Sequence, residues 1–271
     1  MTVRIEKDGA VWTIIHDRPE ARNAMDPDSA DALTAAFLEF DAEKTASVAV
    51  FYGAGGAFCA GWDLKYVSTL DEKYPLGELD IPVAGPQGNG GEIPRGPLGP
   101  SRLELDKPVI AAIEGPAVAG GMELGLWCDF RVMAKGSYLG VYCRRWGVPL
   151  IDGGTVRLPR IVGQGRALEI ILTGRKVPAE ECLAIGLCEY VTREGGARAK
   201  AGALAREIAR FPQVCVRADR RSAIRSHGLG VRDALIQEWY NGREALVEDG
   251  VAGASRFKDG LGRHGDFERI R

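Results

Sequence analysis

Two glycine-rich segments, each directly after a short apolar run, constrain the fold of this chain most strongly. Residues 53–64 follow the apolar run 48–52, and residues 115–124 follow the apolar run 109–113. Short apolar runs of this kind are typical of buried strands, and glycine clusters permit tight turns. Each segment therefore predicts a strand, a turn and a helix in that order, which favours an α/β fold.

Neither glycine segment fits a nucleotide-binding motif. Gly115 and Gly120 have the spacing of a phosphate loop, but Met122 follows Gly121 where such a loop requires Lys and then Ser or Thr. Two interpretations remain open. The turns expose backbone N–H groups near helix N-termini, where they can bind an anion or a developing oxyanion. Alternatively, the glycines only permit tight turns and close packing.

The rest of the chain shows further alternation of strand and helix patterns. Strands are expected near residues 11–15 and 129–133, and an amphipathic helix near 27–44. Residues 71–101 are rich in proline and glycine, which predicts a long loop without regular structure. After residue 156 the chain is expected to be mostly helical, with helices near 164–172, 178–185, 197–210, 213–226 and 231–247.

Composition and charge exclude several classes of protein. The chain of 271 residues has a net charge of −2, which gives no general attraction to nucleic acid or to anionic lipid. It has no apolar run of about 18 residues and no N-terminal signal pattern, so we expect no membrane association and a cytoplasmic location.

The cysteines and histidines do not suggest a metal site. The six cysteines form no C-x-x-C pair, and the three histidines are not spaced as metal ligands. In a cytoplasmic chain we expect buried, reduced thiols at five of the cysteines, namely Cys59, Cys128, Cys182, Cys188 and Cys215. We therefore expect no bound metal.

Together, the two glycine segments resemble the signature stretches of the crotonase (enoyl-CoA hydratase/isomerase) superfamily. The sequence F-C-A-G-x-D-L at 58–64 and the sequence A-G-G-x-E-L at 119–124 carry this resemblance. It extends in order over roughly residues 10–250, through further matching elements at 18–25, 107–115, 153–163, 172–175 and 184–187.

The resemblance implies a fold, an assembly and a substrate class. Residues 1–195 would form a spiral of ββα turns that carries the coenzyme A and oxyanion sites. Residues 196–271 would form a C-terminal helical region for trimerisation and for covering the pocket. A homotrimer or a dimer of trimers is expected. The substrate would be an acyl-CoA, and no separate cofactor is expected because coenzyme A is part of that substrate.

The resemblance also assigns the binding positions. The backbone N–H groups of Trp62 and Gly120 would bind the thioester oxygen, on which enolate charge develops. The positions matching the coenzyme A groove of the family are Ala60, Asp63, Leu64 and Lys65, with Arg22 and Ala24 from the N-terminal element.

Hydratases of this family use two glutamates, and only the first has a counterpart here. Glu123 lies among apolar residues, where burial would raise its pKa toward neutrality. Cys143 occupies the position of the second glutamate, and a thiol is a poor substitute for a carboxylic acid. Asp152 is the alternative acid, although a turn or helix-cap role is equally open for it.

Three functions remain open at this stage. The first is an enoyl-CoA hydratase that acts on a 2-enoyl-CoA with Glu123 as general acid/base. The second is an enoyl-CoA isomerase, or another enolate enzyme, in which Glu123 and Asp152 share the proton transfer. The third, suggested by Cys143, is an acyl-CoA binding protein with little activity. The loop at 71–101 would cover the acyl pocket.

Overall fold

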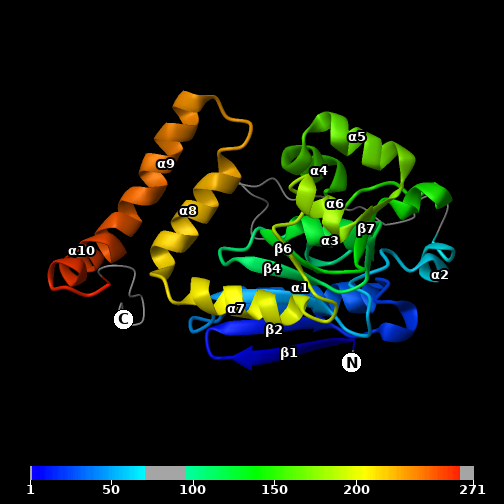
Figure 1. Cartoon of the computed structure of the whole chain (residues 1–271), viewed down its shortest axis with the longest axis horizontal. Helices are drawn as coiled ribbons and strands as arrows, with labels where there is room; N and C mark the ends of the chain where they lie inside the picture. Colours follow the sequence, from blue (N-terminus) through cyan, green and yellow to red (C-terminus); the bar gives the residue numbers. More distant parts are fainter. Residues whose placement is uncertain (1, 71–95, 263–271) are drawn as a thin grey trace.

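The computed structural model describes residues 2–70 and 96–262, so most of the expected loop at 71–101 lies outside the described residues. A six-stranded sheet forms the centre of the fold, with β1 and β2 antiparallel and the other neighbours parallel (Figure 1). In spatial order its strands are β1 (Val3–Asp8), β2 (Val11–His16), β3 (Val48–Gly53), β4 (Val109–Ile113), β6 (Phe130–Ala134) and β9 (Tyr190–Thr192).

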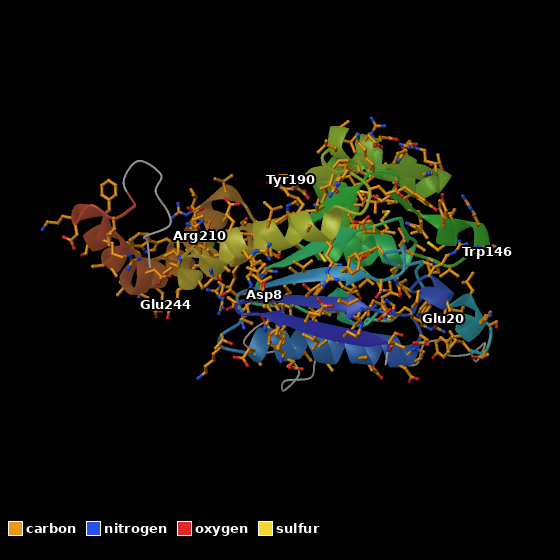
Figure 2. The ribbon with its side chains drawn as sticks, turned by 60° about the horizontal axis from the view of Figure 1, so that its bottom comes forward. Asp8, Glu20, Trp146, Tyr190, Arg210 and Glu244 are labelled. Carbon is orange, nitrogen blue, oxygen red and sulfur yellow. The ribbon has the colours of Figure 1, made fainter. Side chains whose placement is uncertain are left out.

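Both faces of this sheet are covered by helices, which explains why its central strands β3 and β4 read as continuous apolar runs. In β3, Val48 and Val50 pack with the alanine side of α7 (Ala197–Ala209). Ala49 and Phe51 point the other way, into the core that contains α1 (Pro27–Ala42). Figure 2 shows the strands between these two helices. Because successive strand residues face opposite sides, the side chains of the run are buried alternately in these two layers.

The helix α1 begins and ends close to the predicted bounds of 27–44. The side chain of Asp26 accepts a hydrogen bond from the Ser29 amide at 2.9 Å, and Pro27 occupies the first helical turn. The cap satisfies an amide that has no partner within the helix, and proline loses nothing at this position. The start of α1 is therefore determined by local sequence.

A second, three-stranded sheet gives the fold its repeating unit. It contains β5 (Pro116–Val118), β7 (Tyr138–Gly140) and β8 (Lys176–Pro178), and Cys59 forms a bridge with Ala117 at its edge. Three successive chain segments each pass from the large sheet to the small sheet and then into a helix. They begin at β3, β4 and β6, and this repetition builds the spiral of ββα turns.

The remaining helices fall into two groups. One group precedes β9 in the chain, and within it α3 and α6 pack against the small sheet. This group contains α2 (Leu64–Val67), α3 (Gly120–Trp127), α4 (Gly154–Val162), α5 (Gln164–Thr173) and α6 (Ala179–Ala184), with the short helices η1 (Pro19–Ala21), η2 (Pro100–Arg102) and η3 (Tyr142–Trp146). The other group, α8 (Gln213–Arg225), α9 (Val231–Ala245), η4 (Leu246–Gly250) and α10 (Val251–Lys258), extends away from the sheets (Figure 1).

Two expectations need correction. Cys215 is exposed on α8, whereas the other five cysteines are buried as expected or, for Cys143, buried at the site. The segment 71–101 was expected to lack regular structure throughout, but its end forms the helical turn η2. Among the described residues, no helix is long and apolar enough to cross a membrane.

The buried histidine at the end of β2 predicts a pH dependence of stability. His16 is fully buried, and neither ring nitrogen has a hydrogen-bond partner in the described chain. Burial lowers the pKa of His16 from 6.5 to about 4. Below pH 6.5 the unfolded chain binds a proton at this residue, whereas the folded chain does not bind it until about pH 4. The free energy of unfolding therefore decreases as the pH is lowered from 6.5 to about 4.

We expect this histidine to reduce the free energy of unfolding by about 2 kcal/mol between pH 7 and pH 5. In a His16→Leu variant this part of the loss should disappear, because no group remains to titrate. Urea unfolding at both pH values measures the difference. An unchanged pH dependence in the variant would contradict the assignment.

Candidate active site

The two glycine segments lie directly against each other at the edge of the small sheet. The amide of Val118 donates to the carbonyl of Cys59 at 3.0 Å. A Cβ atom added to Gly61 would lie 3.0 Å from the nitrogen of Gly120, so the two turns approach as closely as backbone allows. The spiral therefore brings together equivalent positions from two successive ββα turns.

The amides expected to bind an oxyanion, those of Trp62 and Gly120, belong to these adjoining turns. Within the described part of the chain, neither amide donates a hydrogen bond. Gly120 begins α3, whose first amides have no partner inside the helix. Ala119 before it has φ of 53°, a left-handed conformation that is costly for a residue with a side chain. Both N–H groups are thus available to a ligand.

A cavity of about 490 Å³ opens in front of these turns. All the residues expected at the site from the sequence line this cavity, and so do residues that the sequence did not suggest, including Leu98, Tyr142 and Trp146. The expected residues that line it are Arg22, Ala24, Ala60, Trp62, Asp63, Leu64, Lys65, Gly120, Glu123, Cys143 and Asp152.

Glu123 is the most perturbed acid in this cavity. It lies in the first turn of α3 and is only 2% exposed. Its Oε1 accepts hydrogen bonds from the amides of Asp152 at 2.9 Å and Gly154 at 2.8 Å. Burial, reinforced by the negative charge of Asp152, raises the pKa of Glu123 to about 7, although the two amides oppose the shift. Both of these hydrogen bonds end on Oε1, and no bond from the described residues to Oε2 accompanies them.

Asp152 is a second buried carboxyl group, not the helix cap that the sequence allowed. Gly153 caps α4, and no side chain donates or accepts at that cap. The Oδ1 of Asp152 instead accepts from the Leu98 amide at 3.2 Å and from the Ser101 hydroxyl. Burial raises the pKa of Asp152, while its hydrogen bond with Ser101 acts in the opposite direction.

Cys143 lies in the short helix η3, is buried, and lines the same cavity. Burial raises the pKa of the Cys143 thiol, and the nearby charge of Glu123 raises it further. The thiol therefore remains protonated at neutral pH and does not replace a carboxylate as a base.

The expected coenzyme A residues also line the cavity, and one of them has a structural role. Asp63 caps α2 by accepting from the Lys65 amide at 3.0 Å, and it pairs with Arg18 at 2.8 Å. Arg22 has left-handed φ of 52° at the end of η1. Among the described residues, no group of three His, Cys, Asp or Glu side chains is placed to bind a metal ion.

Comparison with known proteins agrees with this geometry. The sequence model of the enoyl-CoA hydratase/isomerase family matches residues 6–76 and 101–228. The chain belongs to this family. It is 33% identical to an enoyl-CoA hydratase of Mycobacterium tuberculosis over 252 residues, which are 90% of this chain and 88% of that protein. It is 32% identical to a carnitinyl-CoA dehydratase of Salmonella arizonae over 240 residues, which are 88% of this chain and 84% of the relative.

The fold agrees equally well with a solved member of the family. The crystal structure of an enoyl-CoA hydratase from M. tuberculosis matches with a TM-score of 0.83 and 31% identity, over 95% of this chain and 96% of that one. The expected crotonase fold, an α/β spiral with a C-terminal helical region, is confirmed. As a family member this chain is a lyase or an isomerase, which disfavours the third interpretation, an acyl-CoA binding protein with little activity.

Two further residues, next to the active-site cavity, could not be found from the sequence either. Ser101 stands in the proline-rich segment, where nothing distinguishes it from its neighbours. Arg157 is one of two arginines in the helix α4, and only the structure separates the half-buried Arg157 from the exposed Arg160. Both contact the turn that carries Asp152.

Proposed function

We propose that this enzyme hydrates a 2-enoyl-CoA thioester, with Glu123 as the general acid/base. The observation that supports this proposal most directly is a buried glutamate with a pKa of about 7 in the same cavity as two backbone amides that donate to none of the described residues. An acid with a pKa near the working pH gives and accepts protons readily. The relatives named as a hydratase and a dehydratase catalyse, by their names, the two directions of such a reaction.

The chemical steps follow from these groups. The ionised Glu123 takes a proton from water as the water oxygen bonds to C3 of the enoyl group. The electrons of the C2–C3 double bond move onto the thioester oxygen, where the Trp62 and Gly120 amides stabilise the charge. Each such donor contributes about 3–4 kcal/mol in other enzymes. Glu123 then returns the proton to C2, so that one water has been added.

A single proton carrier is consistent with Cys143 at the position of the second glutamate. Because burial keeps this thiol protonated, the proton taken from water has one obvious carrier, Glu123.

The test of hydration is to incubate the enzyme with 2-enoyl-CoA and 3-enoyl-CoA thioesters and to follow the absorbance of the conjugated thioester. Loss of absorbance with the 2-enoyl substrate supports hydration, and no turnover of it would contradict this proposal.

Isomerisation of a 3-enoyl-CoA is the second candidate, and Asp152 is the observation that favours it. Moving the double bond requires removal of a proton from C2 and addition of one at C4. Two buried carboxyl groups on one cavity, Glu123 and Asp152, can divide these transfers. A gain of conjugated absorbance from the 3-enoyl substrate would support this reaction.

An Asp152→Asn variant separates the two candidates. The amide oxygen of Asn can still accept from Ser101 and Leu98, so the local structure should persist, but it no longer carries a proton. If Asp152 transfers a proton, isomerisation should fall on the order of 100-fold or more. Hydration through Glu123 should change much less. Equal losses of both activities would assign Asp152 to the structure of the site instead.

We further propose that the enzyme assembles as a homotrimer or a dimer of trimers through its C-terminal helices. These helices expose large apolar side chains in the single chain, among them Val231, Leu235, Trp239, Val247, Val251 and Phe257. Exposed apolar surface of this extent is typical of an interface. Light scattering should give the mass of three or six chains, and a mass of one chain would contradict the proposal.

A further inference from the structure

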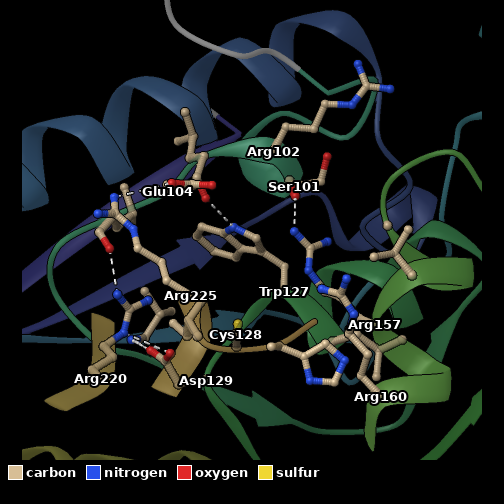
Figure 3. A pocket seen from close by; sticks show the side chains of 18 of the residues that line it. Ser101, Arg102, Glu104, Trp127, Cys128, Asp129, Arg157, Arg160, Arg220 and Arg225 are labelled. Carbon is tan, nitrogen blue, oxygen red and sulfur yellow. Dashed lines mark hydrogen bonds and ion pairs between the residues drawn. The ribbon is translucent and has the colours of Figure 1, made fainter. Parts of the chain in front are cut away.

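A second cavity, of about 1060 Å³, lies behind the turn that carries Asp152. Ile151 and Asp152 line both cavities, so this turn is the wall between them. Ser101 and Arg157 line the larger cavity (Figure 3). The residues behind the wall and the carboxyl groups in front of it therefore meet at one turn.

Arg157 joins the two segments that meet at this wall. Its Nη1 donates to the carbonyl of Asp152 at 2.9 Å, and its Nη2 donates to the carbonyl of Ser101 at 2.8 Å. Figure 3 shows its guanidinium pointing toward Ser101. The Ser101 hydroxyl in turn donates to Asp152 Oδ1, and the Asp152 amide donates to Glu123 Oε1. The guanidinium of Arg157 thus bonds to the backbone of Ser101 and Asp152, the two residues that in turn hydrogen-bond to the carboxyl groups of Asp152 and Glu123.

Glycines leave the space that these groups occupy. A Cβ atom on Gly153 would lie 2.1 Å from Nη1 of Arg157. A Cβ atom on Gly154 would lie 2.9 Å from Cγ and Oε1 of Glu123. The adjacent glycines therefore make room for the arginine on one side of the wall and for the glutamate on the other.

We propose that Arg157 is a positioning residue, which holds the turn before α4 against η2 so that Glu123 and Asp152 keep their places in the active-site cavity. The inference rests on the proposed function only where it concerns turnover. Arg157 touches no reacting atom, because its two bonds reach carbonyl groups on the far side of the wall.

The charge of Arg157 adds an effect that can be measured without substrate. Its positive charge lowers the pKa of both Glu123 and Asp152, against the larger effect of burial. Among the described residues, the charged or titratable groups that interact with Glu123, Asp152 or Arg157 include Arg102, Arg160, Cys59, Cys128 and Cys143. Removing the charge at position 157 should therefore raise the pKa of Glu123 above about 7.

The test compares Arg157→Met and Arg157→Lys with Arg160→Met as the matched control. Arg160 lies on the same helix and lines the larger cavity, but it is exposed and makes no hydrogen bond with the described residues. Infrared titration of the protonated carboxyl band that is absent in Glu123→Gln gives the pKa of Glu123. Steady-state kinetics over pH gives kcat and KM.

We expect Arg157→Met, but not Arg160→Met, to raise the infrared midpoint. Arg157→Lys keeps the charge but not the two-pronged geometry. It should leave the midpoint near that of the wild type and lower kcat by about 10- to 100-fold with a smaller change in KM.

An unmoved midpoint in Arg157→Met, or wild-type kcat in Arg157→Lys, would overturn the inference. If Arg157→Met does not fold, Arg157→Lys decides alone. If the wild type turns over no enoyl-CoA, the proposed function fails, while the infrared titration still tests the effect of Arg157.

Discussion

Replacing Glu123 by Gln should lower kcat for hydration by on the order of 10²- to 10⁴-fold, because the variant has no group to exchange the proton of water. The Gln oxygen can still accept from the amides of Asp152 and Gly154, so the fold of the site should be retained. The wild-type rate should rise with pH through about 7, since the ionised form is the base. The variant should lose this dependence.

The same substitution should stabilise the protein at alkaline pH. The pKa of Glu123 is 4.5 in the unfolded reference and about 7 in the folded chain, so stability is lost as pH rises through this interval. At pH 8 the Gln variant should gain up to about 3 kcal/mol in the free energy of unfolding. A gain in stability together with a loss of turnover is expected for an acid whose burial serves catalysis.

A second buried glutamate provides the matched control for this experiment. Glu114 is also buried and also accepts from two backbone amides, those of Gly195 and Ala197, but it does not line the active-site cavity. Glu114→Gln should keep turnover near that of the wild type. Full turnover in Glu123→Gln, or an equal loss in both variants, would remove Glu123 from the mechanism.

The sequence predicted the fold where its local signals were strong. The strands β3 and β4 and the helix α1 were predicted within two residues of their observed bounds, because uninterrupted apolar runs before a glycine turn and helical periodicity are strong signals. The three-residue strands β5, β7 and β8 were not predicted, since so short a segment has no usable periodicity. Their positions depend on pairing with distant strands.

The site was predictable only as far as its motifs extend. Glu123 and the two glycine turns stand inside signature sequences, and the structure brings all the expected residues to one cavity. The environment of Asp152 was not predictable, because its partner Ser101 lies 51 residues away in a segment without a motif. The pKa of Asp152 depends on long-range contacts of this kind, and a local sequence pattern does not contain them.

The close approach of the two glycine turns predicts a second large effect, at Gly61. In Gly61→Ala the new Cβ atom would lie 2.8 Å from Cβ of Ala119 and 3.0 Å from the nitrogen of Gly120, so the turns must move apart. A displaced amide no longer points at the thioester oxygen. Loss of one such donor lowers kcat by about 10²- to 10³-fold in other enzymes, and we expect a fall of this size here.

The control variant Gly56→Ala separates the effect of moving the turns apart from the stability cost of an alanine at positive φ. Both glycines have positive φ, 87° at Gly61 and 81° at Gly56, so alanine at either position should cost about 1–2 kcal/mol of stability. A Cβ atom on Gly56 meets no atom within 4 Å, so Gly56→Ala should keep its turnover. Thermal unfolding and initial rates of both variants provide the comparison. Equal rates in the two variants would mean that the contact between Gly61 and Gly120 does not position the oxyanion site, because the two substitutions share the backbone strain and differ in that contact.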